Sequence, residues 1–541
     1  MKYLILTILS FCAFFSALSQ TANLGLPEII RNSELKICSY IKQPSIDVAK
    51  EIAKDELDNF SRVYRFGVEQ LVSIDVFEKA DKKILENGDI LYQLGIFCPN
   101  AVSINVLFDQ FELKNGVRMN LVSYHKGDYI GAYTSLNNNA AKQLGTDILY
   151  DNRVIIEVVQ PKNTANKSTL HLSMIVSGYR DLEVLMSKAI GQAANCHYDV
   201  NCPIGIGWEE PRNSVGFVVS GGNACSGALV NNTSGRIIPY YLTANHCGTA
   251  LVGSSVYRFR WERDAANTIC AATNSAANNG PTNMTINGSV LRANNSGSDF
   301  ILVELNAKPD SAWGIYYSGW DRSDALTVTQ STGIHHPNGD IKKISINTDP
   351  LTHLVSSFNG NPAAEFWKVN NWEFGATQPG SSGSPLFDQN KRIIGVLAGG
   401  SSNCSGTSPN GDWDAYGRFA VAWDQGATPA TRLKDWLDSA GVNPITLDGI
   451  DPRDVLSTKM NEDIKSEFEI FPNPANEFIQ INSKNGMLIE GISLYDLTGK
   501  VILEREIHDL QSTINTSELK GLYFVKIQTV RGAVVEKLIV K

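Results

Sequence analysis

The sequence predicts an all-β protein built from several domains. Strand-like runs rich in β-branched residues fill the first part of the chain, and short apolar runs separated by Gly, Ser and Asn fill the middle. A shorter β-rich block, punctuated by turn residues, closes it. At 541 residues the chain is too long for a single hydrophobic core. The predicted fold is therefore a series of β domains joined by short connections.

The first 19 residues are expected to be a secretory signal peptide. Lys2 supplies a positive start, residues 3–15 form an apolar run, and Ala17-Leu18-Ser19 is a small-residue cleavage site. The run is too short to span a bilayer, and no other segment is apolar enough to do so. We therefore expect an exported protein with no transmembrane segment after removal of the signal.

Residues 20–188 form the first block. A mixed charged and apolar pattern over 47–66 is compatible with a helix, and the β-branched runs that follow predict strands at 90–97, 102–108, 154–159 and 170–176. The block holds no cluster of residues that suggests catalysis. Its fold is expected to be mainly β.

Residues 189–447 form the second block, in which short apolar runs separated by Gly, Ser and Asn are typical of a β-barrel protein. A surface helix is expected over 429–438, with Leu433 and Trp436 on one face. A polar linker over 448–466 follows. The last block, 467–541, has β runs at 478–481, 492–494, 501–503, 522–527 and 534–540 and is expected to be a small β-sandwich.

Composition and cysteine usage narrow the class of protein. The net charge is −9 and no basic run offers phosphate contacts, so a nucleic-acid partner is not expected. Removing Cys12 with the signal leaves eight cysteines, an even number that suggests disulfides in an exported chain. A zinc site is the alternative, but the cysteines are scattered and no CxxC pair occurs. We expect neither a metal nor an organic cofactor.

Three local strings carry the predicted chemistry. His246 lies in Leu-Thr-Ala-Asn-His-Cys at 242–247, Asp299 precedes an apolar strand, and Ser382 lies in Pro-Gly-Ser-Ser-Gly-Ser-Pro at 379–385. A serine hydroxyl needs a base within hydrogen-bond reach, and the base needs an orienting acid. The chain order His, Asp, Ser is that of a two-barrel serine protease. We predict His246 as base, Asp299 as orienting acid and Ser382 as nucleophile.

Each of these residues has neighbouring alternatives. Ser381 and Ser384 flank the predicted nucleophile, and Asp321 and Asp324 are weaker candidates for the acid because they fall in a polar loop. Glycines on both sides of Ser382 allow a sharp turn that points the amides of Gly380 and Ser382 at one spot, the predicted oxyanion hole.

The remaining histidines are predicted to be structural. His335 and His336 are adjacent, so on an extended strand they point to opposite faces and do not chelate one ion together. The sequence offers no evident partner for His197 or His353.

Residues 196–448 resemble the lysyl endopeptidases, a secreted bacterial branch of the chymotrypsin-like serine proteases. The resemblance implies a double β-barrel fold and the same roles for His246, Asp299 and Ser382. The matching strings are Leu229–Thr233, 242–247, 298–305, 319–322, 334–337, 378–385 and 416–418.

The resemblance also implies a pocket for lysine. Asp414 stands three residues before the glycine of Tyr-Gly-Arg, where the family places the specificity aspartate, and Asp412 is the spare candidate. Gly399 and Gly400 would leave room in the pocket wall for a long side chain. The chain departs from the best-known lysine-specific members at Ala398, where they have a histidine stacked on a tryptophan, and residues 351–359 contain no tryptophan.

Three disulfides follow from the resemblance, and a fourth is a guess for the first block. The implied bridges are Cys196–Cys404, Cys202–Cys270 and Cys225–Cys247, and the guessed one is Cys38–Cys98.

The first block is then interpreted as an inhibitory, folding-assisting propeptide of the peptidase, with an unrelated binding domain as the alternative. Lys188 lies on a short polar arm before Cys196, and exposed arms between domains are common sites of cleavage. An enzyme that cuts after lysine is expected to cut there itself.

The last block resembles the C-terminal sorting domains of the type IX secretion system, with a carbohydrate-binding or adhesive sandwich as the alternative. The resemblance implies contact with the secretion machinery and release or display outside a Gram-negative cell. The strings that carry it lie at 471–475, 492–500, 521–525 and 535–541.

The function expected from the sequence is hydrolysis of polypeptides on the carboxyl side of lysine. Broader specificity for lysine and arginine, or for another residue, is one alternative. A catalytically inactive surface-binding protein on the same fold is the other.

Overall fold

The computed structural model divides the chain into two compact units, residues 1–450 and 451–541. It describes residues 25–32, 38–57, 63–164, 167–180, 193–272, 280–325, 327–358, 363–453, 467–484, 486–497, 501–529 and 532–541. The predicted signal peptide, Lys188 and residues 454–466 of the predicted linker lie outside this set. Among the described helices, none has the length and apolar character needed to cross a membrane.

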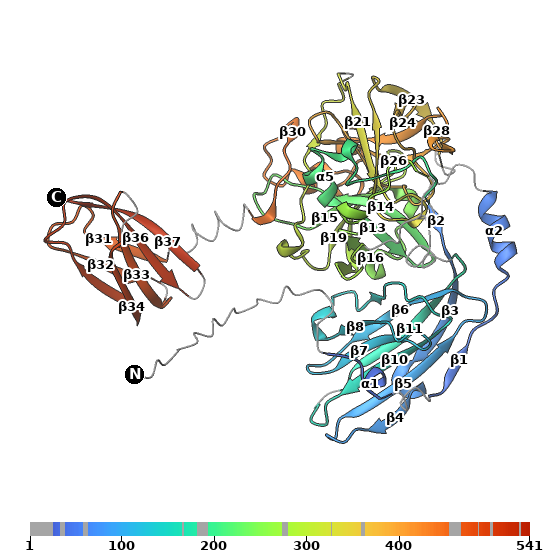
Figure 1. Cartoon of the computed structure of the whole chain (residues 1–541), viewed down its shortest axis with the longest axis horizontal. Helices are drawn as coiled ribbons and strands as arrows, with labels where there is room; N and C mark the ends of the chain where they lie inside the picture. Colours follow the sequence, from blue (N-terminus) through green and yellow to red (C-terminus); the bar gives the residue numbers. More distant parts are fainter. Residues whose placement is uncertain are drawn as a thin grey trace, which may run out of the picture. The chain divides into compact units, whose positions relative to one another are not determined.

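The N-terminal block is a pair of sheets with a shared core, as the β-branched runs predict (Figure 1). Leu94, Val106 and Leu121 of that core come from different strands across the two sheets. The first sheet contains β1 (Tyr40–Lys42), β5 (Ile90–Phe97), β10 (Arg153–Gln160), β7 (Arg118–Ser123) and β8 (Tyr129–Tyr133), with β4 (Asp81–Ile84) on β5. The second runs β3 (Gly67–Asp75), β11 (Thr169–Gly178), β6 (Ser103–Glu112) and β9 (Leu144–Gly145).

Short helices accompany these sheets. The helix expected over 47–66 is shorter than the pattern: α2 covers Val48–Glu56, capped by the Asp47 side chain on the amide of Lys50, and a strand follows at β2 (Tyr64–Arg65). The others are α1 (Glu28–Arg31) and α3 (Val76–Lys79).

The guessed Cys38–Cys98 disulfide is wrong, because both cysteines are free thiols. The parallel register of β1 on β5 pairs Tyr40 with Gly95 and Lys42 with Phe97. Cys38 therefore lies toward the start of β5 whereas Cys98 follows its end, about five residues or ~17 Å away. A disulfide requires Cα atoms within about 7 Å.

The middle block consists mainly of two sheets, which confirms its predicted all-β character. The first runs β17 (Thr285–Asn287), β16 (Val256–Phe259), β13 (Val215–Ser220), β14 (Asn223–Leu229), β15 (Tyr240–Thr243), β19 (Phe300–Leu305) and β18 (Ser289–Asn295), with β2 on β14. The second runs β12 (Tyr198–Asp199), β22 (Lys343–Asn347), β21 (Ser331–His335), β25 (Pro385–Phe387), β26 (Ile393–Gly400), β29 (Asp414–Arg418), β24 (Ala364–Val369) and β23 (Thr352–Ser356), with β20 (Trp320–Asp321) and β30 (Thr446–Leu447) attached.

Smaller elements complete this block. Its helices are α5 (Glu209–Ser214), α6 (Phe419–Asp424) and α7 (Lys434–Leu437), and β27 (Cys404–Ser405) pairs with β28 (Ser408–Pro409). The helix expected over 429–438 is broken into a 3-10 turn at Pro429–Thr431 and the short α7. Leu433 and Leu437 are its buried apolar residues, while Trp436 is half-buried.

The N-terminal block docks on the first sheet of the middle block. Strand β2 extends that sheet beside β14, and the amide of Phe66 donates to the carbonyl of Gly222 at 2.9 Å. One apolar cluster takes Phe66 and Val176 from the N-terminal block and Phe217 from the sheet. The contact is a shared core rather than a loose surface apposition.

A buried ion pair crosses the same interface. The guanidinium of Arg258 on β16 holds both carboxylate oxygens of Asp147, at 2.6 and 2.7 Å. Arg258 is buried and also lies 4.7 Å from the ring centre of Trp261.

The C-terminal unit is a small sandwich, in agreement with the sequence prediction (Figure 1). Its core joins residues of both sheets, including Ile479, Ile492 and Val525. One sheet contains β31 (Phe468–Phe471), β32 (Phe478–Ser483) and β35 (Gln511–Asn515), and the other contains β34 (Val501–Asp509), β33 (Ile489–Tyr495), β36 (Gly521–Thr529) and β37 (Gly532–Val540).

Candidate active site

His246 sits on a short 3-10 turn, Asn245–Cys247, directly after strand β15. The turn is tied to β14 by the disulfide between Cys225 and Cys247. The backbone amide of His246 donates to Asp299 Oδ1 at 3.0 Å. Both the covalent bridge and this hydrogen bond fix the backbone from which the imidazole projects.

Asp299 enters strand β19 in a left-handed conformation, with φ at +51°. Aspartate tolerates this region better than most residues. Its second oxygen, Oδ2, lies 2.7 Å from His246 Nδ1, and its side chain is almost fully buried. A buried carboxylate that receives the Nδ1–H fixes the tautomer and leaves Nε2 as an acceptor.

Ser382 completes the group. Its Oγ lies 2.6 Å from His246 Nε2, so the hydroxyl can donate to the free lone pair of the imidazole. Gly380 and Gly383 on either side have φ values of +95° and +79°, which a side chain would strain. The structure thus brings together the three side chains that the sequence singled out, from loops of two different sheets.

The alternatives point elsewhere. Ser381 Oγ lies 2.7 Å from His335 Nδ1, and Ser384 Oγ is buried without a hydrogen-bond partner among the described residues. Asp324 pairs with Arg418 at 2.8 Å, and Asp321 accepts the amide of Ser323.

The amides of Gly380 and Ser382 lie in the same loop as the hydroxyl. Within the described residues neither amide donates a hydrogen bond to another backbone carbonyl. Three carbonyls of the loop accept hydrogen bonds: Pro379 O from Asn338 N, Gly380 O from Ser226 Oγ and Ser382 O from Ser226 N. The loop therefore keeps two donors available beside Ser382.

Asp414 is the first residue of β29 and is fully buried. Its Oδ2 accepts from Trp372 Nε1 at 2.7 Å, Thr377 Oγ1 at 2.9 Å and Ser402 Oγ at 2.5 Å. These donors are all neutral, so they orient the carboxylate and leave its charge in place. None of the three was singled out in the sequence, because they lie 12 to 42 residues from Asp414 with no local motif.

Gly399 and Gly400 lie opposite this residue on β26, paired with Ala415 and Asp414 respectively. A Cβ at Gly400 would come within 2.3 Å of Asp414 Oδ1, so a side chain at this position would clash with the carboxylate. The same strand hydrogen-bonds through Leu397 to Gly383, next to Ser382. The spare candidate Asp412 is exposed and accepts from Asn410.

Ala398, the point of departure from the lysine-specific pattern, packs in a small apolar cluster with Phe358 and Phe366. His353 and His197, for which the sequence offered no partner, both have one. The ring of His353 lies 4.7 Å from that of Trp367, and His197 Nε2 lies 3.0 Å from Gln378 Oε1.

Three disulfides are formed, with the pairing that the family resemblance implied: Cys196–Cys404, Cys202–Cys270 and Cys225–Cys247. The one cluster of metal-ligating type found among the described residues is Cys196, His197 and Cys404, and two of its three members are joined in a disulfide.

Two β sheets that contribute a carboxylate, an imidazole and a hydroxyl to one hydrogen-bonded chain define the class of chymotrypsin-like serine proteases. Comparison with known proteins shows what parts of the chain are similar to. Residues 190–417 match the family described as lysyl endopeptidase, C-terminal domain, and residues 469–541 match the secretion system C-terminal sorting domain. Both predicted resemblances are thereby confirmed, and the second marks a secreted or cell-surface protein of a Gram-negative bacterium.

Among curated proteins, the chain is 26% identical over 267 residues to a lysyl endopeptidase of Pseudomonas aeruginosa. The match covers 47% of this chain and 54% of that protein, so the chain spans about half the length of this relative.

Similar solved structures include the Rv3671c protease of M. tuberculosis in an inactive form, with a TM-score of 0.25, 12% identity and coverage of 40% of this chain and 88% of that one. A Glu endopeptidase structure gives a TM-score of 0.23, 20% identity and coverage of 38% and 86%. With scores this low, the fold assignment rests on the sheets and contacts of the chain itself.

Proposed function

We propose that this protein is a secreted serine endopeptidase that hydrolyses peptide bonds on the carboxyl side of lysine. The observation that carries the proposal is the chain of hydrogen bonds from Asp299 through His246 to Ser382, at 2.7 and 2.6 Å. This arrangement lets a neutral imidazole take the serine proton while the carboxylate stabilises the imidazolium.

In the proposed reaction, Ser382 Oγ forms a bond to the peptide carbonyl carbon as its proton moves to His246 Nε2. The resulting oxyanion is held by the amides of Gly380 and Ser382. The C–N bond then breaks as Nε2 returns the proton to the leaving amine. Water, deprotonated by His246, hydrolyses the ester and restores the hydroxyl.

Asp414, with Gly399 and Gly400, is the proposed specificity site. A fully buried carboxylate held by neutral donors favours a cationic side chain, and Gly400 places no side chain against it. The resemblance to lysyl endopeptidases supports lysine over arginine.

The test is cleavage-site mapping by mass spectrometry on a denatured protein digested with the purified enzyme. We expect new carboxyl termini at lysine, and none from a Ser382→Ala protein. Equal cleavage after arginine would broaden the specificity, and cleavage after apolar or acidic residues would remove Asp414 from the pocket. Failure of the wild-type protein to react with a fluorophosphonate probe would favour the inactive surface-binding alternative.

The N-terminal block is proposed to be the propeptide, both inhibitor and folding partner, and to be released after Lys188. Its contacts with β14 and β16 support a folding role. A Ser382→Ala protein that still matures in a purified preparation would contradict self-cleavage.

The C-terminal sandwich is proposed to contact the secretion machinery, as its family match suggests. Deleting residues 467–541 is expected to retain the protein inside the cell, which fractionation would detect.

A further inference from the structure

We propose that the turn at residues 335–340, between β21 and β22, is a positioning element that holds the oxyanion loop 378–383 in its reactive form. His335 and Ser381 form its central hydrogen-bonded pair. This positioning role requires that the protein is an active peptidase, so it rests on the proposed function.

The first contact concerns the peptide bond that carries the Gly380 amide. The amide of Asn338 donates to the carbonyl of Pro379. In a trans peptide the carbonyl and the following N–H point in opposite directions. Holding Pro379 O on the turn therefore directs the Gly380 N–H away from the turn.

Close packing prevents this peptide from rotating. A Cβ on Gly380 would lie 2.7 Å from the His336 carbonyl oxygen and 2.9 Å from the Gly339 amide nitrogen. The loop thus lies directly against the turn, at a glycine with φ of +95°.

A second link runs through Ser226 of β14. The amide of His336 donates to Ser226 Oγ at 2.9 Å, and Ser226 Oγ donates to the carbonyl of Gly380 at 2.8 Å. The Ser226 amide also donates to the carbonyl of Ser382 at 2.8 Å. The turn and β14 together hold the carbonyls on both sides of the nucleophile.

The third link is the buried His335, whose hydrogen-bond directions follow from its partners. Ser345 Oγ donates its hydrogen to Ala376 O at 2.9 Å, so it must accept from His335 Nε2 at 3.0 Å. His335 Nδ1 is then an acceptor, and it takes the hydrogen of Ser381 Oγ at 2.7 Å.

Ser381 is in turn connected to the start of the loop. Its oxygen accepts the amide of Gln378 at 3.2 Å, and its own amide donates to Gln378 O at 2.9 Å. The side chain next to the nucleophile is therefore connected through His335 and Ser345 to the second sheet.

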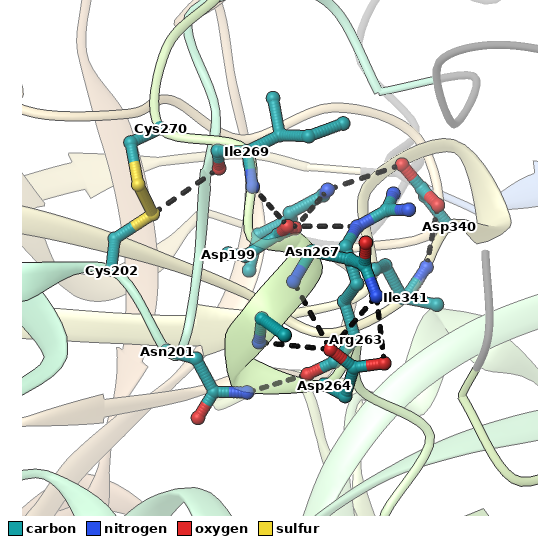
Figure 2. A network of polar contacts seen from close by, with 12 residues as sticks. Asp199, Asn201, Cys202, Arg263, Asp264, Asn267, Ile269, Cys270, Asp340 and Ile341 are labelled. Carbon is teal, nitrogen blue, oxygen red and sulfur yellow. Dashed lines mark hydrogen bonds and ion pairs between the residues drawn. A yellow bond between two sulfur atoms is a disulfide. The ribbon is translucent and has the colours of Figure 1, made fainter. Parts of the chain in front are cut away.

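A buried charge network anchors the base of the turn (Figure 2). Asp340 lies 3.4 Å from Lys343 Nζ, and Lys343 Nζ reaches Asp199 Oδ1 at 2.5 Å. Arg263 Nε donates to the other oxygen of Asp199 at 2.9 Å, beside the Cys202–Cys270 disulfide. We call Asp199, Arg263, Asp340 and Lys343 the anchor network.

The experiment compares Ser381→Ala with Ser384→Ala in the full-length protein. Ser384 is a matched control, because like Ser381 it is a buried serine close to the nucleophile, from which it is two residues away. It differs in that its Oγ has no hydrogen-bond partner among the described residues. Each variant is normalised by active-site titration. Its kcat and KM are measured together with its affinity for a lysine-based peptidyl boronic acid, which forms a tetrahedral adduct, and for n-butylamine, which fills the pocket without one.

For Ser381→Ala we expect kcat and boronic acid affinity to fall in parallel by about 10- to 100-fold, less than the loss of an entire oxyanion donor. KM and the affinity for n-butylamine should stay within about twofold, because ground-state binding does not use the oxyanion hole. Ser384→Ala should match the wild type in all four.

Unchanged kcat and boronic acid affinity in Ser381→Ala would overturn the positioning role, as would an equal loss in Ser384→Ala. Equal losses for the boronic acid and the amine would also overturn it, since they would indicate general damage to the site. A wild-type protein without peptidase activity would instead refute the proposed function.

Discussion

Two buried carboxylates of the protease region, Asp414 and Asp199, are held in opposite ways. Asp414 accepts hydrogen bonds from an indole and two hydroxyls, all neutral. Asp199 lies between the cations of Arg263 and Lys343. Neutral donors orient a carboxylate without supplying a counter-charge, whereas two cations compensate its charge within the protein. Burial alone therefore does not mark a binding site; the charge of the surrounding donors does.

The largest expected effect is on stability, from Asp199→Asn. Removing the carboxylate takes a shared counter-charge away from two buried cations, so the free energy of unfolding should fall by about 3–5 kcal/mol. Urea denaturation of the full chain measures it, with the exposed Asp264→Asn as control. A loss below about 1 kcal/mol would show that the anchor network is not structural.

Asp414→Asn should act on substrate rather than on the fold. The amide oxygen still accepts from the three donors, but the charge that we propose receives the lysine side chain is lost, so kcat/KM for lysine peptides should fall about 10²- to 10³-fold. Asp412→Asn serves as the control. If the variant kept lysine cleavage but lost stability, Asp414 would be a structural carboxylate like Asp199 and not a substrate-binding one.

Acid should destabilise the protease region through His197, which lies near the anchor network. Burial, reinforced by the charge of Lys343, lowers the pKa of His197 to about 3. The unfolded chain, with a histidine pKa of about 6.5, takes up a proton that the native state does not, so stability falls as the pH drops from about 6.5 towards 3. The slope for one proton is about 1.4 kcal/mol per pH unit.

Comparing pH-dependent unfolding of the wild type and His197→Gln checks this expectation. The variant should lose up to one proton of slope relative to the wild type. Identical slopes for wild type and His197→Gln would contradict it.

The smallest effect is expected from Thr377→Val, which removes one of the three donors to Asp414. A single neutral hydrogen bond contributes about 1 kcal/mol, so the free energy of unfolding should fall by about that amount. KM should change by less than about threefold, in either direction. Denaturation and steady-state kinetics measure the two. A loss as large as that of Asp199→Asn would mean that neutral and charged donors are equivalent here.

The sequence predicted the parts of the site whose constraints are local. The glycines around Ser382 and the turn that ends at Cys247 are encoded by short sequence motifs, which can be recognised without the structure. His246, Asp299 and Ser382, predicted from these motifs, are adjacent in space. The donors around Asp414 and the pairing of Asp199 with Lys343 could not be predicted. They depend on strand register across as many as 144 residues, which no periodicity encodes.

The Cys38–Cys98 guess failed for a related reason. Two cysteines in one domain suggest a disulfide, but the parallel register of β1 on β5 places them about five residues apart along β5. His335 was assigned a merely structural role because its partner Ser381 is 46 residues away.

The ion pair between Arg258 and Asp147 has a consequence for handling the two parts separately. Separating residues 25–180 from residues 193–450 would remove the apolar neighbours that the N-terminal block supplies to Phe217 and Val256, and would take Asp147 away from Arg258. The newly exposed face would be apolar at its centre, with the cationic Arg258 beside it. An exposed apolar patch of this kind favours self-association. A protease region released after Lys188, as proposed above, would therefore have to cover this face again or repack it.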